Sequence, residues 1–256
     1  MDEHVSGAGF DALLEELVQE GASTVHHGRP GLPAARKRRF ADRMAPFLGE
    51  GDPPEAIDLL LSHTFAAVRE VGAILLARSA CSAPIVLERA RLLALDDDWE
   101  VREWAVEPLV AALADDPRAG LMPWIRAGGH LRRAAVLAAR HFVLEGRLEA
   151  QTACVVADAV VDDSDPYVQA NVGAFYLGDA LVRRFPQCAA GWLAGRARAG
   201  RVSGPFWKNV TALCRSAGAR REAAVLRPAL DELLLAGPPR TARERIMAFR
   251  QEGGNG

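Results

Sequence analysis

An internal repeat of about 30 residues constrains the fold of this chain more than any other feature of its sequence. In four segments, a loop is followed by an apolar residue, a polar residue and a run rich in Ala and Leu. The equivalent apolar positions are 33, 30 and 37 residues apart and are occupied by Val68, Val101, Leu131 and Val168. A unit of this length has room for two helices and two turns, so the chain is expected to stack helix pairs.

The composition favours helices over strands. Good helix formers such as Ala, Leu and Arg are abundant, while aromatic residues make up only 6% of the chain. Two of the repeated helices follow acidic loops that can cap them, Asp96 to Asp98 before Trp99 and Asp162 to Pro166 before Tyr167. These features predict an all-α protein, a right-handed, curved α-solenoid of HEAT-like helical repeats with about six helix pairs.

The same pattern predicts the domain organisation. Residues 1–236 are expected to form a single HEAT-like repeat domain, in which the helical segment from Val225 onward is interrupted at Pro228. After Gly237-Pro238-Pro239, residues 237–256 are expected to form a short C-terminal helix and a flexible tail.

The charges are distributed unevenly along the chain. The first 114 residues hold 19 acids against 11 Lys and Arg, whereas Ala180 to Ala229 hold ten bases and the single acid Glu222. A second basic cluster lies at Arg36 to Arg39. A field of one sign suits a polyanion, so the concave face of the solenoid is predicted to be basic. The alternative, that these residues are solvated helix faces, stays open.

The cysteines and histidines give no sign of a metal site or a disulfide framework. Cys81, Cys154, Cys188 and Cys214 form no C-x-x-C pair, and His26-His27 has no partner at ligand spacing. No apolar run reaches the length of about 18 residues that a membrane span needs, and no signal peptide opens the chain. We therefore expect a cytoplasmic protein with unpaired thiols, no bound metal and no membrane partner.

One helix start carries the strongest functional signal. In the helix that begins with the segment D-W-E-V-R-E-W-A, the residues Val101, Ala105 and Leu109 form one stripe that should face the core. Trp99 and Glu103 lie one turn apart on a different stripe and are expected to project together. Within the same helix, Trp104 falls beside the core stripe and is interpreted as structural, and Pro108 should bend the helix.

The chain resembles the AlkC/AlkD-type DNA alkylation-repair glycosylases over about residues 55 to 215. The resemblance is carried by D-W-E-V-R-E-W-A with Pro108, D-D-P at 115–117, P-W-I at 123–125, L-R-R-A-A-V-L at 131–137 and V-Q-A-N-V-G at 168–173. It implies a HEAT-like solenoid that holds duplex DNA in a basic concave face. It also implies excision of cationic N3- or N7-alkylated purines, with bulky adducts from a genotoxic natural product left open as substrates.

The resemblance also implies roles for individual residues. Trp99 would be the aromatic wall of the site, Glu103 the catalytic acid, and Arg133 a phosphate contact. The aromatic residue expected after V-Q-A-N-V-G falls at Ala174, with Phe175 or Tyr176 as substitutes. Tyr176 is taken as the substrate contact, with a place in the core as its other interpretation. An ungapped match toward D-D-P would instead put the acid at Arg102. Further DNA contacts are expected at Arg102, Trp207, Lys208, Arg38 and Arg39.

The residue types suit this chemistry without the resemblance. A cationic alkylpurine is already a good leaving group, so the enzyme needs only to stabilise a positive sugar and hold a water, which a carboxylate can do. An indole can contact the cationic base through its negative face. No metal or cofactor is needed, and we expect a monomer bound to DNA in the bacterial cytoplasm, associated with the nucleoid.

Other interpretations remain open. Arg69, Arg102, Arg132 and Gln169 occupy equivalent repeat positions, where a polar residue often tethers neighbouring units. Glu70 repeats the V-R-E of the site without a preceding tryptophan, so that tripeptide can be scaffold. Trp124 and Trp192 are interpreted as core residues, and Trp207 as either a DNA contact or a packing residue. The alternative functions are a non-catalytic HEAT-repeat protein that binds damaged or branched DNA, a protein-binding HEAT adaptor, or a lyase-type solenoid for a tetrapyrrole.

Overall fold

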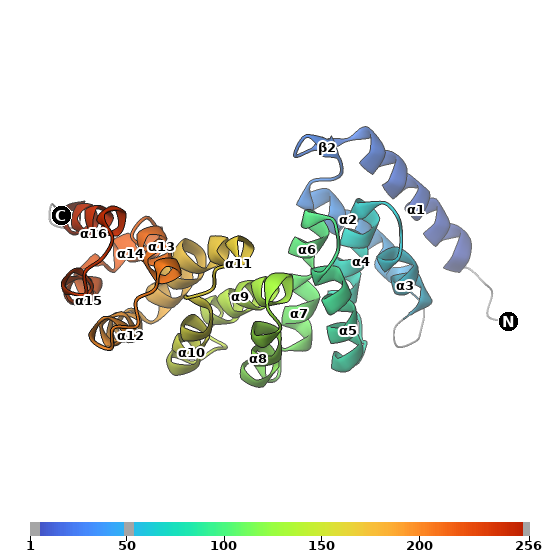
Figure 1. Cartoon of the computed structure of the whole chain (residues 1–256). Coiled ribbons are helices and arrows are strands. Elements are labelled where there is room, and N and C mark those ends of the chain that lie inside the picture. The colour runs from blue at the N-terminus through green and yellow to red at the C-terminus, as the bar shows by residue number, and fades with distance from the viewer. Residues whose placement is uncertain (1–5, 49–53, 253–256) are drawn as a thin grey trace. The chain divides into compact units, whose positions relative to one another are not determined.

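The computed structural model describes residues 6–48 and 54–252, and these form helices apart from one short hairpin (Figure 1). The prediction of an all-α protein is therefore confirmed. The chain divides into two compact units, Met1–Asp115 and Asp116–Gly256, where the sequence predicted one domain over residues 1–236. The division separates the charges, because the first unit holds 20 acids and 11 bases and the second holds 13 acids and 20 bases.

The first unit contains α-helices, one 3₁₀-helix and the hairpin. Its elements are α1 (Ser6–Ser23), β1 (Val25–His26), β2 (Arg29–Pro30), α2 (Ala34–Met44), the 3₁₀-helix η1 (Ala45–Phe47), α3 (Glu55–Leu61), α4 (Ala66–Arg78), α5 (Ala83–Ala94), α6 (Trp99–Trp104) and α7 (Val106–Ala112).

Helix α4 is the centre of the first unit. It packs against α1, α2, α3, α6 and α7, and nearly all of its length from Ala67 to Leu76 is buried. A helix that is buried on nearly every side has to be surrounded by other elements. Its side chains Val71, Ile74 and Leu75 meet Phe40 of α2 in the core cluster, and Trp104 packs partly buried against this cluster. The structural role predicted for Trp104 is therefore confirmed.

The helix predicted over residues 99–113 is broken in the middle. Helix α6 ends at Trp104 and α7 begins at Val106, with Ala105 between them. Pro108 has no N–H to donate to the carbonyl of residue 104, so the helical ladder cannot run through this point. Val101, Ala105 and Leu109 are fully buried, as the core stripe predicted.

The second unit contains α-helices and one π-helix. Its elements are α8 (Pro117–Ala127), α9 (Gly129–Leu144), α10 (Ala150–Val160), α11 (Pro166–Asn171), the π-helix η2 (Val172–Val182), α12 (Pro186–Arg198), α13 (Gly204–Leu213), α14 (Ala217–Arg221), α15 (Ala223–Leu235) and α16 (Arg240–Glu252).

The end of the second unit differs from the sequence prediction in one respect. Pro228 lies inside α15, which continues through it from Ala223 to Leu235, so the predicted interruption is wrong. Helix α16 packs against α13 and α15 as the last helix of this unit. Of the predicted tail, residues 253–256 lie outside the described part of the chain.

The polar position of each repeat ties its helix to a loop. Arg69 donates to the carbonyl oxygens of His63 and Thr64 in the preceding loop and to the Asp96 carboxylate in the loop of the next repeat. Arg132 does the same in the second unit, with the carbonyl of Ile125 and the carboxylate of Asp163. These contacts support the predicted tethering role, because charge-assisted bonds fix loops that backbone pairing leaves free.

Two glycines bring the π-helix η2 and α14 into direct contact. A Cβ atom at Gly218 would overlap the carbonyl oxygen of Gly178, and one at Gly178 would overlap the side chain of Ser216. The Asp179 carboxylate also accepts a hydrogen bond of 3.0 Å from the Gly218 N–H. The backbones can therefore approach this closely only because both residues lack a side chain.

The cysteine thiols are unbonded, but two of them are neighbours. Cys154 on α10 and Cys188 on α12 are 34 residues apart in the chain, and their Sγ atoms lie 2.8 Å apart. The sequence predicted separate unpaired thiols because neither spacing nor motif connects these positions.

Substituting Gly218→Ala should lower the free energy of unfolding by about 3 kcal/mol, because the new methyl group must push the α14 and η2 backbones apart. The matched control is Gly191→Ala on α12, where a Cβ atom meets nothing within 4 Å. There the gain in helix propensity should stabilise the protein by about 1 kcal/mol. Chemical denaturation of both variants measures the difference, and equal effects would contradict the close approach of η2 and α14.

Candidate functional site

The N-terminus of α6 presents the predicted aromatic residue and acid. The Asp98 carboxylate caps the helix by accepting hydrogen bonds from the backbone N–H groups of Glu100 (2.8 Å) and Val101 (3.4 Å). This cap fixes Trp99 as the first helical residue, and its side chain is 46% exposed. Glu103, one turn later, is also exposed. The two side chains thus lie outside the core, as the sequence predicted.

A hairpin lies against this helix start. Strands β1 and β2 pair Val25 with Pro30 and His26 with Arg29, which leaves His27 and Gly28 as a two-residue turn. Both turn residues have positive φ, 51° at His27 and 79° at Gly28. This is the turn that matches the twist of two antiparallel strands, and it is usually formed by Asn-Gly or Asp-Gly. The hairpin therefore places His27 in the left-handed region, which is uncommon for residues other than Gly but which His, like Asn and Asp, adopts more often than other residues do.

Arg29 joins the hairpin to α6. Its guanidinium pairs with both oxygens of the Asp98 carboxylate, with an Nη2–Oδ1 distance of 2.8 Å. The same guanidinium lies 5.6 Å from the centre of the Trp99 ring, and the His27 ring meets that indole edge-on at 5.6 Å. A two-pronged Arg–carboxylate pair is geometrically specific, so it orients the hairpin relative to Trp99.

A buried lysine lies beneath this surface. Lys37 on α2 is 2% exposed, and its ammonium group pairs with Glu70 on α4, which is 1% exposed. It also donates to Glu100 Oε2 on α6 at 3.1 Å. Arg29 adds a further contact of 3.3 Å to the same Glu100 oxygen. The Lys37–Glu70–Glu100 cluster thus connects α2, α4 and α6, and removal of its only buried cation would leave two carboxylates without compensation.

The pKa values of the two carboxyl groups of the cluster shift in opposite directions. Burial raises the pKa of Glu70 to about 7, and the nearby Lys37 only partly offsets this effect. Burial acts in the same direction on the pKa of Glu100, but the hydrogen bonds of Lys37 and Glu70 and the charge of Arg29 outweigh it and lower that pKa below its usual range. Near neutral pH, Glu100 is therefore the carboxyl group that keeps its negative charge.

Two of the three predicted DNA contacts of the first unit have partners within the protein. Arg102 donates to the carbonyl oxygens of Asp96 (2.6 Å) and Asp97 (2.9 Å), so its guanidinium holds the loop before α6. Arg38 is exposed, pairs with Glu107 and lies 5.2 Å from the centre of the Trp104 ring. Arg39 is exposed on the same helix. Glu70, which shares the V-R-E tripeptide, is buried scaffold as the sequence indicated.

In the second unit, two predicted contacts need correction. Tyr176 is fully buried on η2 and its hydroxyl donates to the Ala153 carbonyl at 2.8 Å, so it presents no surface to a substrate. Trp207 is 6% exposed and packs edge-on against the Phe206 ring, so it cannot meet a DNA backbone. Phe175, the other aromatic residue considered at this position, is 50% exposed.

The two basic residues predicted in this unit are more accessible. Lys208 is exposed on α13, and Arg133 is half-buried on α9. Of the two predicted core tryptophans, Trp124 is half-buried on α8, and Trp192 is half-buried with its ring 6.4 Å from that of Phe206.

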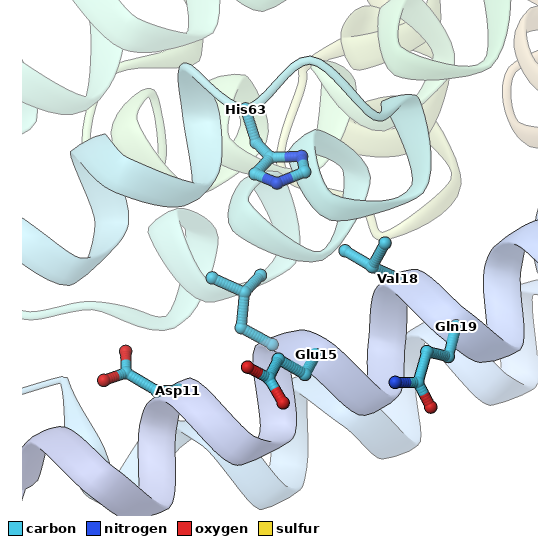
Figure 2. A pocket seen from close by; sticks show the side chains of 6 residues that line it. Asp11, Glu15, Val18, Gln19 and His63 are labelled. Carbon is cyan, nitrogen blue, oxygen red and sulfur yellow. The ribbon is translucent and has the colours of Figure 1, made fainter.

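The described residues also form grooves away from α6. One, of about 460 Å³, lies between α1 and the loop after α3, with Asp11 and Glu15 on one side and His63 on the other (Figure 2). His63 Nδ1 accepts a 3.0 Å hydrogen bond from the Phe65 N–H, which fixes its ring. This groove contains none of the residues that the sequence singled out.

Sequence reasoning missed the Lys37–Glu70–Glu100 cluster and the hairpin histidines. The hairpin turn His27-Gly28 and the position of Glu100, one turn before Trp104 on the side next to the core stripe, were the available signals. The histidines have no partner nearby in the sequence, and for this reason the sequence predicts no metal site at them. Their partner, Glu100, lies more than 70 residues further along the chain.

A comparison of the chain with protein-family models, with curated proteins and with solved structures finds no match. The likeness to the AlkC/AlkD-type glycosylases therefore rests on the quoted sequence segments, and the activity that it implies stays a prediction. Among the helices in residues 6–48 and 54–252, none combines the length and apolar character that crossing a membrane requires.

Substituting Lys37→Met should lower the free energy of unfolding by about 3–5 kcal/mol, because two buried carboxyl groups lose their cation. The control is Arg36→Met on the same helix, where an exposed pair with Glu20 is lost and the expected change is below about 1 kcal/mol. Chemical denaturation measures both. Adding Glu70→Gln to Lys37→Met should restore part of the loss, and equal effects of the two single variants would contradict the role of the buried cluster.

Proposed function

We propose that the protein is a DNA glycosylase that excises cationic N3- or N7-alkylated purines from duplex DNA, with bulky adducts included among the candidate substrates. The observation that carries the proposal is the exposure of Trp99 and Glu103 one turn apart on α6. The Trp99 indole lies at the first turn of α6 and is nearly half exposed, and core packing does not account for such a position. An aromatic surface beside a carboxylate suits a cationic base and the positive sugar that its departure leaves.

The proposed reaction needs only these side chains and water. The bond between C1′ of the sugar and the purine nitrogen breaks, and the alkylated base leaves with the electron pair, which neutralises its charge. A water oxygen bonds to C1′, and the Glu103 carboxylate takes the proton of that water as general base. Arg29 is one planar cation that lies over the Trp99 ring. Almost half of Trp99 stays exposed, and in this proposal the cationic alkylated base contacts that exposed part.

The second unit supplies the charge for DNA binding in this proposal. Its excess of 20 bases over 13 acids contrasts with the acidic first unit. Exposed bases follow one another from η2 to α14, at Arg183, Arg184, Arg198, Lys208, Arg215, Arg220 and Arg221. Such bases bind phosphates irrespective of sequence. The predicted right-handed solenoid with a basic concave face, and the phosphate contact at Arg133, belong to this proposal.

The same charge separation favours a second candidate, a non-catalytic protein that binds damaged or branched duplex. In that case the bases of the second unit bind DNA and the acid on α6 has no chemical role. The two candidates share the DNA-binding surface, so duplex affinity cannot separate them. Release of the base can.

Substituting Glu103→Gln should slow the release of 7-methylguanine or 3-methyladenine from methylated duplex by at least about 100-fold, because the general base is lost. Duplex affinity should stay within the error of the wild-type value, since an exposed amide replaces an exposed carboxylate. Mass spectrometry of the freed bases and fluorescence anisotropy of labelled duplex measure the two quantities.

The control is Glu88→Gln on α5, which removes another well-exposed carboxylate of the same unit. It should leave base release unchanged. Release by Glu103→Gln at the wild-type rate would eliminate Glu103 as the acid. No release by the wild-type protein, together with duplex binding, would favour the non-catalytic candidate.

A further inference from the structure

We propose that His26, His27 and Glu100 bind one divalent transition-metal ion, zinc in particular, at the junction of the hairpin and α6. Glu100 Oε1 lies 4.0 Å from His26 Nε2 and 3.8 Å from His27 Nε2. One ligand atom from each of the three residues lies within 4.8 Å of the other two. The proposal does not depend on the glycosylase activity, because Glu103 is not one of the ligands.

The hairpin turn is what brings the two imidazoles to one carboxylate. Neighbouring residues in an extended strand point to opposite faces, so a His-His pair in a straight strand cannot share a ligand. Here His26 belongs to β1, while His27 turns back with a φ of 51°. The rings consequently lie side by side with their centres 4.0 Å apart.

Glu100 has one carboxylate oxygen to which no described residue donates a hydrogen bond. Its side chain is 7% exposed, and Oε1 is a buried oxygen without a hydrogen-bond partner among the described residues. An unpaired buried acceptor costs free energy, and a cation between Oε1 and the imidazoles would remove that cost. Oε2 is meanwhile held by Lys37 and Arg29, which fixes the carboxylate as outer-shell contacts do in metal sites.

The distances are close to those of a zinc site. Tetrahedral zinc with bonds of about 2.0–2.2 Å to nitrogen and oxygen places its ligand atoms about 3.4 Å apart. The observed separations of 3.8 Å and 4.0 Å therefore need a closure of about 0.5 Å, the scale of a small side-chain rotation. Two imidazoles and one carboxylate favour zinc over the oxygen-binding ions magnesium and calcium.

The charges around the site permit a divalent ion. The cations Lys37 and Arg29 face the carboxyl groups of Glu70, Asp98 and Glu100, so the surroundings carry no excess of positive charge. The His27 side chain is 56% exposed, which leaves the outer side of the site open to solvent. Three protein ligands with an open fourth position are typical of a zinc ion that carries a water or a substrate group.

Zinc binding to the purified full-length chain tests the proposal, by equilibrium dialysis with elemental analysis and by calorimetric titration with zinc chloride. One zinc ion per chain is expected. His27→Asn keeps a residue that accepts positive φ, so the turn is retained and the ligand is lost. This variant should weaken zinc binding more than about 10-fold. Loss of outer-shell contacts alone costs about 10-fold or more in metal affinity, and loss of a ligand should cost at least as much.

The control is His141→Asn, an exposed histidine of α9 that pairs with Glu145 and should leave zinc binding unchanged. His26→Gln provides a second ligand variant if His27→Asn does not fold, as judged by circular dichroism. The proposal is overturned if the wild-type chain binds no zinc, or if the foldable ligand variant binds it as tightly as the control does.

Cobalt(II) substitution gives an independent measurement. A site with three protein ligands and a water should give the intense visible absorption of tetrahedral cobalt, and the ligand variant should lose it. Weak octahedral absorption that is the same in the wild-type chain and both variants would mean adventitious surface binding and would overturn the proposal. Base release by the metal-free protein is measured separately from metal binding. A failure of the zinc proposal can therefore be told apart from a failure of the glycosylase proposal.

Discussion

The rest of the first unit depends on the ion pairs that the buried ammonium group of Lys37 forms. This group pairs with Glu70 on α4 and with Glu100 on α6, and thereby ties three helices together at a point where water is excluded. Such a cluster stabilises the fold only while all its members are present, since each ion left alone is costly. Its contribution is orientation. Lys37 and Arg29 both contact Glu100 Oε2, and these contacts fix the hairpin and the first turn of α6 in one relative arrangement.

That arrangement places chemically different groups on one small surface. Trp99 and Glu103 project from α6, while the imidazoles of His26 and His27 face the free oxygen of Glu100 next to the same indole. Rigid elements hold these groups: a capped helix start and a two-residue turn. Sites built on such elements are positioned more precisely than sites on long loops. The excess of basic residues lies in the other unit, so the proposed function assigns DNA binding and chemistry to different parts of the chain.

The sequence predicted the elements that follow from local periodicity and capping. The core stripe through Val101 and Leu109 and the break near Pro108 were predictable because they depend on residues within one or two turns. The Lys37–Glu70–Glu100 cluster was not, because its members are 33 and 30 residues apart and two of them resemble ordinary surface charges. The substrate contact predicted at Tyr176 is wrong for a local reason. Because η2 is a π-helix, its changed period turns the Tyr176 side chain into the core and leaves Phe175 outside.

Amide hydrogen exchange measured by mass spectrometry, with Lys37→Met compared to the wild-type chain, tests most directly whether the buried cation holds the site together. Residues 25–30 of the hairpin and residues 98–103 of α6 should lose protection together in the variant, and more than α5 does, because the shared anchor is gone. Helices α12 to α15 of the second unit should exchange as before. Retained protection in the hairpin and at the start of α6, or loss in only one of them, would contradict the claim that Lys37 fixes both.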